Sequence, residues 1–198
     1  MPSLKEVETY LTGLWLLFKQ DPRGFSFLDL SDRGALRSFW AAVWALPTIV
    51  ISFLWWRKAF LETLPAGADV DAIFFFRLTL VEFANWVVPL VLVGILCWMV
   101  GIGTKFAAVV AISNWMAVPV SYAYAALVLL MMMVPAIDTA VAFAWLGLML
   151  AFIVSLFRIF RMVFGNHTLT IATVTMVLLV PSMILSELLE RYLGVFPG

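Results

Sequence analysis

Long apolar stretches separated by short polar segments make up most of the chain. Five of them are long enough to cross a bilayer core about 30 Å thick, which takes about 20 helical residues at 1.5 Å per residue. These stretches cover residues 38–56, 78–100, 106–134, 139–157 and 168–186. The pattern predicts an all-α integral membrane protein with five transmembrane helices. Pro119 lies inside the third stretch and leaves open whether that helix is continuous.

The first 20 residues follow a different pattern, in which apolar positions recur at helical spacing and polar residues occupy the opposite side. The apolar positions are Leu4, Val7, Leu11, Leu14, Trp15 and Phe18. Ser3 and Glu6 have the spacing of a capping box, which indicates a helix start. We therefore expect an N-terminal amphipathic helix over about 3–20. It either lies flat in the membrane interface or packs on the cytoplasmic face of the protein itself.

The apolar stretches and the charged residues between them divide the chain into three parts. We expect a cytoplasmic N-terminal segment over 1–37, a five-helix bundle over 38–187 and a short outer tail over 188–198. With the N-terminus inside, eight Lys and Arg residues fall in cytoplasmic segments and four in outer segments. This bias favours a cytoplasmic N-terminus and an outer C-terminus.

The composition narrows the class of function. Apolar residues make up 65% of the 198 residues and charged residues 12%, whereas soluble domains carry about 45–50% and about 25%. The formal net charge of zero gives no field that would attract nucleic acid, and we expect no such partner. The chain has one cysteine, Cys97, and one histidine, His167. Because the usual nucleophile pairs and metal clusters are missing, we expect a non-enzymatic protein without a bound metal or cofactor.

Glu82 is an acidic residue well inside an apolar stretch, with Asn85 one helical turn further on and Asn114 in the next stretch. An ionisable residue in hydrocarbon is costly and is therefore a candidate for function. One interpretation is that Glu82, Asn85 and Asn114 line a polar cavity that binds an ion, a proton or a headgroup. The other is that Glu82 pairs with Arg77 or Arg57 near the outer surface. The two asparagines would then hydrogen-bond neighbouring helices.

Two further patterns are candidate contact surfaces. The fourth stretch carries small residues at helical spacing, which let another helix approach closely, either within the bundle or between subunits. This candidate packing seam consists of Ala136, Ala140, Ala144, Gly147 and Ala151. Basic residues at the inner ends of apolar stretches form a candidate rim for anionic lipid headgroups. They are Lys105, Arg158 and Arg161.

The spans follow one another in a distinctive order. A proline-bearing first span and a glycine-containing turn with Lys105 precede a long third span with Pro119. A fourth span with Trp145, a basic exit and a Thr/Ala-rich fifth span follow. Over about residues 36–188 this order resembles the Yip family of five-span membrane proteins, although the Asp-Leu-Tyr-Gly-Pro motif of eukaryotic members is missing. The resemblance to bacterial members implies an integral membrane protein without an assigned activity, and it transfers no functional residue.

We expect a scaffold or accessory subunit of a membrane assembly, located in the bacterial inner membrane. Its partners would be the lipid bilayer and other membrane protein subunits or a second copy of the chain. The alternative is a small transporter or channel that uses the polar face around Glu82, Asn85 and Asn114. A water-accessible cavity that reaches Glu82 is expected for the transporter, whereas a scaffold should tolerate neutralisation of Glu82.

Overall fold

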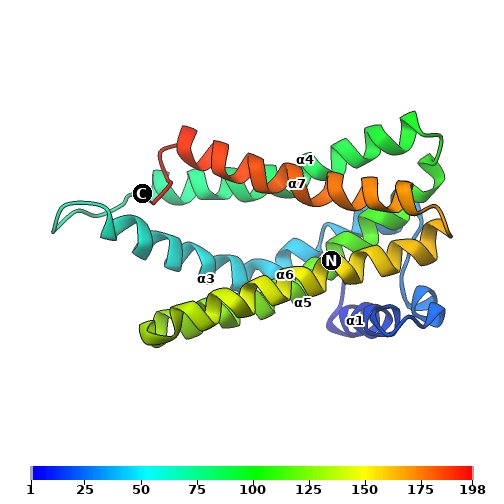
Figure 1. Cartoon of the computed structure of the whole chain (residues 1–198), viewed down its shortest axis with the longest axis horizontal. Coiled ribbons are helices and arrows are strands. Elements are labelled where there is room, and N and C mark those ends of the chain that lie inside the picture. Colours follow the sequence, from blue (N-terminus) through cyan, green and yellow to red (C-terminus); the bar gives the residue numbers. More distant parts are fainter. Residues whose placement is uncertain (1, 198) are drawn as a thin grey trace.

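The computed structural model describes residues 2–197, with the side chains of all of these except residue 135. Within this range every regular element is a helix, and five helical stretches are long and apolar enough to cross a membrane (Figure 1). The spans contain α3 (Ala41–Glu62), α4 (Ala72–Met99), α5 (Phe106–Met133), α6 (Asp138–Phe164) and α7 (Thr168–Tyr192). The prediction of an all-α membrane protein with five spans is confirmed.

Shorter helices precede and connect the spans. They are α1 (Leu4–Phe18), η1 (Pro22–Phe27), α2 (Asp32–Ser38), η2 (Gly103–Lys105) and η3 (Pro135–Ile137). The capping box at the start of α1 is confirmed. The Glu6 N–H donates to Ser3 Oγ at 3.3 Å, and the Ser3 N–H donates to Glu6 Oε2 at 2.8 Å. These two bonds satisfy backbone donors that the first turn of a helix leaves free.

Several predicted helix ends were wrong because charged residues do not end these helices. The first span has a break before Ala41 and then continues through Arg57 to Glu62, and α6 continues through Arg158 to Phe164. Likewise α4 begins at Ala72 and α7 runs to Tyr192. Long basic side chains can reach the interface from within a helix, so their charge is compatible with helical backbone. Helix α5 is continuous at Pro119, which transmembrane helices tolerate.

The spans pack as two groups joined by α6. Helix α3 packs mainly on α5, α4 packs mainly on α7, and α6 contacts both α5 and α7. The loop over 63–71, the α5–α6 connection and the C-terminus lie at one end of the bundle, which we call the C-terminal end (Figure 1). The α4–α5 and α6–α7 connections lie with α1 at the other end, which we call the α1 end.

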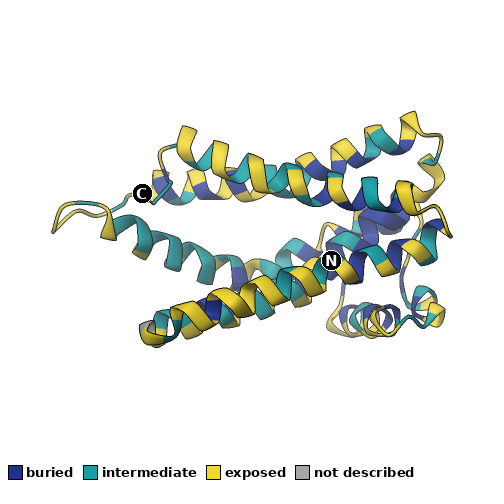
Figure 2. Cartoon of the chain, viewed as in Figure 1, coloured by how far each residue is buried: buried dark blue, intermediate teal, exposed yellow. Residues whose placement is uncertain are grey.

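Buried residues gather toward the α1 end (Figure 2). Fully buried side chains there include Leu17, Val93, Val109, Ile112, Phe160 and Ile171. A smaller cluster around Phe74, Leu78 and Val195 lies at the C-terminal end. The Trp56 indole N–H donates to the Val195 carbonyl at 2.9 Å and holds the C-terminal segment against α3.

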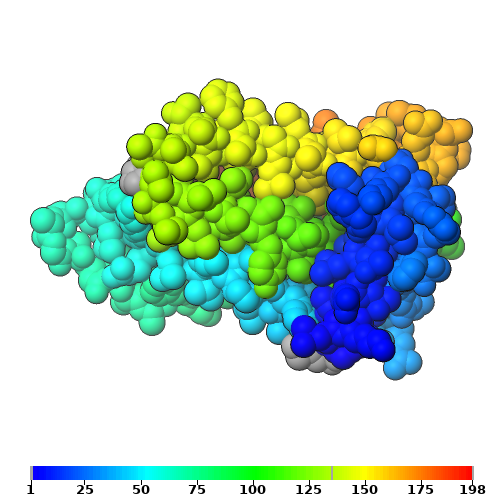
Figure 3. All heavy atoms as spheres, turned by 90° about the horizontal axis from the view of Figure 1, so that it is seen from below, coloured from blue at the N-terminus to red at the C-terminus, as the bar shows by residue number. Residues whose placement is uncertain are grey.

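Helix α1 lies across the direction of the spans, beside α5 and α6 (Figures 1 and 3). Its residues Val7 and Leu14 are buried in the main core, and the Tyr10 ring lies 4.7 Å from the Trp115 ring. The interpretation that α1 packs on the protein itself is therefore confirmed. Another part of its apolar face stays uncovered, with Trp15 56% exposed, and its placement in the membrane interface stays a prediction.

Candidate functional site

A polar cavity of about 170 Å³ lies between α3, α4, α5 and α7, and we call it the Glu82 cavity. All four helices contribute polar side chains to its wall. They are Ser52, Glu82, Tyr124, Ser186 and Glu190. The remaining lining is apolar and includes Trp56, whose indole N–H is bonded to the C-terminal segment. The cavity therefore lies in the half of the bundle that is nearer to the C-terminal end.

The register of α4 and α7 brings the two carboxylates to this cavity. Leu78 and Val81 are buried on α4, and Glu82 comes next to them, with part of its side chain exposed. On α7, Ser186 lies one helical turn before Glu190, and its Oγ–H donates to Glu190 Oε1 at 2.5 Å. This bond fixes the direction of the Glu190 carboxylate.

Neither carboxylate of the Glu82 cavity has a basic partner among residues 2–197. Arg57 instead pairs with Asp69 at 2.7 Å, and its hydrogen bond holds the pKa of Asp69 below the usual range. Arg77 forms no salt bridge with Glu82 in this part of the chain. The interpretation that Glu82 pairs with Arg77 or Arg57 is therefore wrong.

The donor set of the Glu82 cavity consists of oxygen atoms. Two carboxylates that share a small cavity repel each other, so a proton or a cation between them lowers the electrostatic energy. Carboxylate and hydroxyl oxygens suit hard cations rather than soft metals. No group of three or more His, Cys, Asp or Glu side chains within residues 2–197 could hold a metal ion. The arrangement is thus suited to a proton or to one weakly held, partly hydrated cation.

Asn114 joins three helices and lies outside the Glu82 cavity. Its side chain is 1% exposed. Its Nδ2 donates to Ser38 Oγ of α2 at 2.8 Å, and its Oδ1 accepts from Trp86 Nε1 of α4 at 2.9 Å. These bonds agree with the interpretation that this asparagine hydrogen-bonds neighbouring helices.

Asn85 also lies outside the walls of the Glu82 cavity. Its Oδ1 is buried without a hydrogen-bond partner. The structure therefore does not bring Glu82, Asn85 and Asn114 together in one site, and a polar face made of these three residues is not formed.

The small residues of α6 and its flanking turn face outward. All five are exposed, and a Cβ atom added at Gly147 would meet no atom of this chain within 4 Å. They are Ala136, Ala140, Ala144, Gly147 and Ala151. No helix among the described residues covers this seam, so within the chain it is a free surface.

The three basic residues of the predicted rim lie at the α1 end. Lys105 ends η2, whereas Arg158 and Arg161 lie in the last turns of α6. All three are exposed. Arg161 donates to Asn166 Oδ1 at 3.4 Å, and this contact leaves its guanidinium accessible to a headgroup.

The predicted polar site did not include Glu190, Ser186, Ser52 or Tyr124. Glu190 was assigned to an outer tail because the last apolar stretch was taken to end before Glu187. A usable signal was the helical spacing of Ser186 and Glu190, which places both on one side of α7.

No family model, curated protein or solved structure matches the chain. The resemblance to the Yip family therefore stays a prediction that depends on the order of the spans.

Proposed function

We propose that the protein is a small transporter or channel that binds a proton or a monovalent cation in the Glu82 cavity. The observation that carries this proposal is the cavity shared by Glu82 and Glu190, in which Glu82 keeps exposed surface. A cavity that reaches Glu82 is the feature that separates a transporter from a scaffold. An intramembrane carboxylate without a basic partner is costly, and such residues commonly mark ion and proton pathways.

The packing of the bundle supports transport by alternating access. Toward the α1 end the main core of buried side chains, among them Val93, Ile112 and Phe160, separates the spans' interior from that end. A polar cavity near one end and a core of buried side chains toward the other are what one state of such a cycle requires. In this proposal the two groups that move relative to each other are α4 with α7 and α3 with α5, which pack mainly within each pair.

The test is flux across liposomes that contain the purified protein. A pH-sensitive dye inside the liposomes reports proton movement, and Na⁺ and K⁺ are supplied one at a time. We expect flux with the wild type and its loss in Glu82→Gln and Glu190→Gln. Glu187→Gln is the matched control, because Glu187 lies on the same helix but pairs with Arg191 outside the cavity. Unchanged flux in Glu82→Gln, or no flux of any of these ions with the wild type, would contradict the proposal.

A second candidate function, docking to another membrane helix, is supported by the uncovered small residues of α6. Close helix approach at small residues stabilises association in lipid. Ala144→Cys should form disulfide-linked dimers, or link to a partner, under mild oxidation in native membranes. Ala142→Cys is the control, because Ala142 is also exposed but lies on the other side of the helix. The native Cys97 is buried. Equal cross-linking of both variants, or none, would argue against docking through this face.

A further inference from the structure

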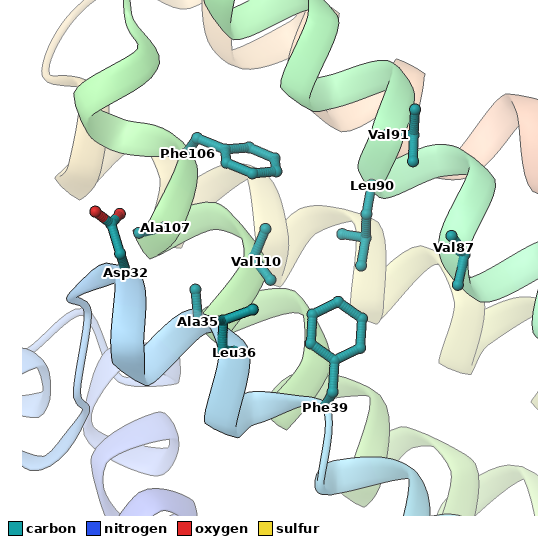
Figure 4. Close-up of a pocket in the computed structure, with 10 residues that line it drawn as sticks. All are labelled: Asp32, Ala35, Leu36, Phe39, Val87, Leu90, Val91, Phe106, Ala107 and Val110. Atoms are coloured by element: carbon teal, nitrogen blue, oxygen red, sulfur yellow. The ribbon is translucent and has the colours of Figure 1, made fainter.

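A second cavity, of about 370 Å³, lies between α2, α4 and α5 toward the α1 end (Figure 4). Its wall is apolar over most of its extent and includes Phe39, Val91, Phe106 and Val110. The exception is Asp32, the first residue of α2. Figure 4 shows the Asp32 carboxylate at one end of the cavity, beside Ala107, with Val91 far from it. We call this space the α2–α4 cavity.

The rim of the α2–α4 cavity is apolar and exposed. Leu36 is 74% exposed and Val91 is 53% exposed, and both lie on helical stretches that are apolar enough to span a membrane. An apolar cavity of this size does not hold ordered water, because water needs polar partners there. Hydrocarbon from the surrounding bilayer is therefore the material that fits the apolar part.

Asp32 is the charged residue that lines the cavity, and a lysine of opposite sign is the sequence neighbour of another lining residue. Asp32 makes no salt bridge among residues 2–197. Lys105 is exposed, is likewise without a salt bridge in that range, and directly precedes Phe106, which lines the cavity. A carboxylate in the wall of an apolar cavity, with a lysine beside a lining residue in the sequence, complements a zwitterionic headgroup. Asp32 accepts hydrogen bonds from a primary ammonium, and Lys105 attracts a phosphate.

We propose that the α2–α4 cavity binds one phospholipid with a primary-amine headgroup, of the phosphatidylethanolamine type. One acyl chain fills the space between Leu36, Val91 and Val110. The headgroup ammonium binds the Asp32 carboxylate, and the phosphate lies toward Lys105. An anionic lipid without an amine fits less well, because it would place its charge beside Asp32. A choline headgroup fits less well, because its quaternary nitrogen has no N–H to donate.

The experiment measures which lipids stay bound to the wild-type protein. The protein is equilibrated in detergent with equal amounts of phosphatidylethanolamine, phosphatidylcholine and phosphatidylglycerol, and retained lipids are counted by native mass spectrometry. We expect one retained lipid per chain, with the ethanolamine lipid enriched about threefold over each competitor, the size expected for a partly exposed charge pair. Equal retention of the three lipids, preference for phosphatidylglycerol, or no retained lipid would overturn the proposal.

Three variants locate the lipid. Asp32→Asn should keep a bound lipid but lose the preference for ethanolamine, because the charge has gone while the apolar wall is unchanged. Val91→Trp should reduce the number of retained lipids by filling the opening. Leu150→Trp is the control, since Leu150 is 52% exposed on α6, away from the cavity. If Asp32→Asn keeps the preference, or Leu150→Trp loses as much lipid as Val91→Trp, the proposed position is wrong. The wild-type competition decides the lipid class even where a variant fails to fold.

Discussion

Replacement of Asn114 by leucine should destabilise the bundle more than any other exchange of one amide side chain. Asn114 is buried and forms one hydrogen bond to α2 and one to α4. Hydrogen bonds between transmembrane helices average about 0.6 kcal/mol and reach about 1.7 kcal/mol. The exchange also leaves the Trp86 indole N–H without its acceptor, which adds about 1–3 kcal/mol where the group stays buried. Since Trp86 is half-buried, we expect a total loss of about 2–3 kcal/mol.

Asn85, an asparagine of α4, provides a matched control for the Asn114 exchange. Its Oδ1 is already buried without a partner, so Asn85→Leu removes a polar atom that is not compensated. We expect Asn85→Leu to be neutral or stabilising. Both variants are compared with the wild type by equilibrium unfolding in mixed micelles, with helix content followed by circular dichroism. Equal stability of Asn114→Leu and the wild type, or a larger loss in Asn85→Leu, would refute the reasoning.

Replacing Trp86, the hydrogen-bond donor to Asn114, measures the contribution of this bond separately. Trp86→Phe removes the N–H donor that Asn114 accepts, so the double variant Trp86→Phe/Asn114→Leu leaves no indole N–H without an acceptor at this contact. Replacing both partners of a buried hydrogen bond costs less than removing one of them. We therefore expect the double variant to lose about 1 kcal/mol less than the sum of the single losses. If the stability loss of the double variant equals the sum of the two single losses, the hydrogen bond contributes nothing to stability.

Two further predictions concern the ends of the bundle. Hydrogen bonds from the Ser3 N–H and the Arg37 guanidinium hold the pKa of Glu6 below its usual range. The stabilisation from these bonds is complete above the pKa of Glu6 in the unfolded chain, about 4.3. It is lost as the pH falls through the lower pKa of Glu6 in the folded protein. The thermal midpoint should therefore drop between pH 6 and pH 3 by less in Glu6→Gln than in the wild type, and equal drops would contradict this assignment. Trp56→Phe should speed amide hydrogen exchange over 193–196, because it removes the bond to the Val195 carbonyl, while global stability changes by about 1 kcal/mol or less. Unchanged exchange there would show that this bond does not hold the C-terminal segment.

The five spans and α1 could be predicted from the sequence because each of them carries a local signal, whereas α2 and the short 3-10 helices were not predicted. Apolar length predicted the five spans, and the spacing of Ser3 and Glu6 predicted the start of α1. The break between α2 and α3 carries no such signal, since the apolar stretch runs on through Phe39 and Trp40. It is visible only as the position where Ser38 bonds to Asn114.

The candidate site could be predicted only in part, because its residues come together through packing. Glu82 stood out as a carboxylate in an apolar stretch, but its counterpart Glu190 lies on another helix near a chain end. Hydropathy also cannot tell which side of α6 faces lipid, since lipid and neighbouring helices are equally apolar. The spacing of small residues around Ala144 therefore predicted a contact surface. That this surface is exposed could be learned only from the packed structure.

The most direct test of the Glu82 cavity is its accessibility to water from one end of the bundle. Ser52→Cys places a thiol in the cavity wall, Ala66→Cys marks the C-terminal end, and Thr104→Cys marks the α1 end. Native Cys97 is buried and provides an unreactive background. A charged, membrane-impermeant thiol reagent should modify Ser52→Cys from the side that modifies Ala66→Cys, and not from the side that modifies Thr104→Cys. If Ser52→Cys stays unmodified from both sides, Glu82 does not face an aqueous cavity and the transport proposal fails.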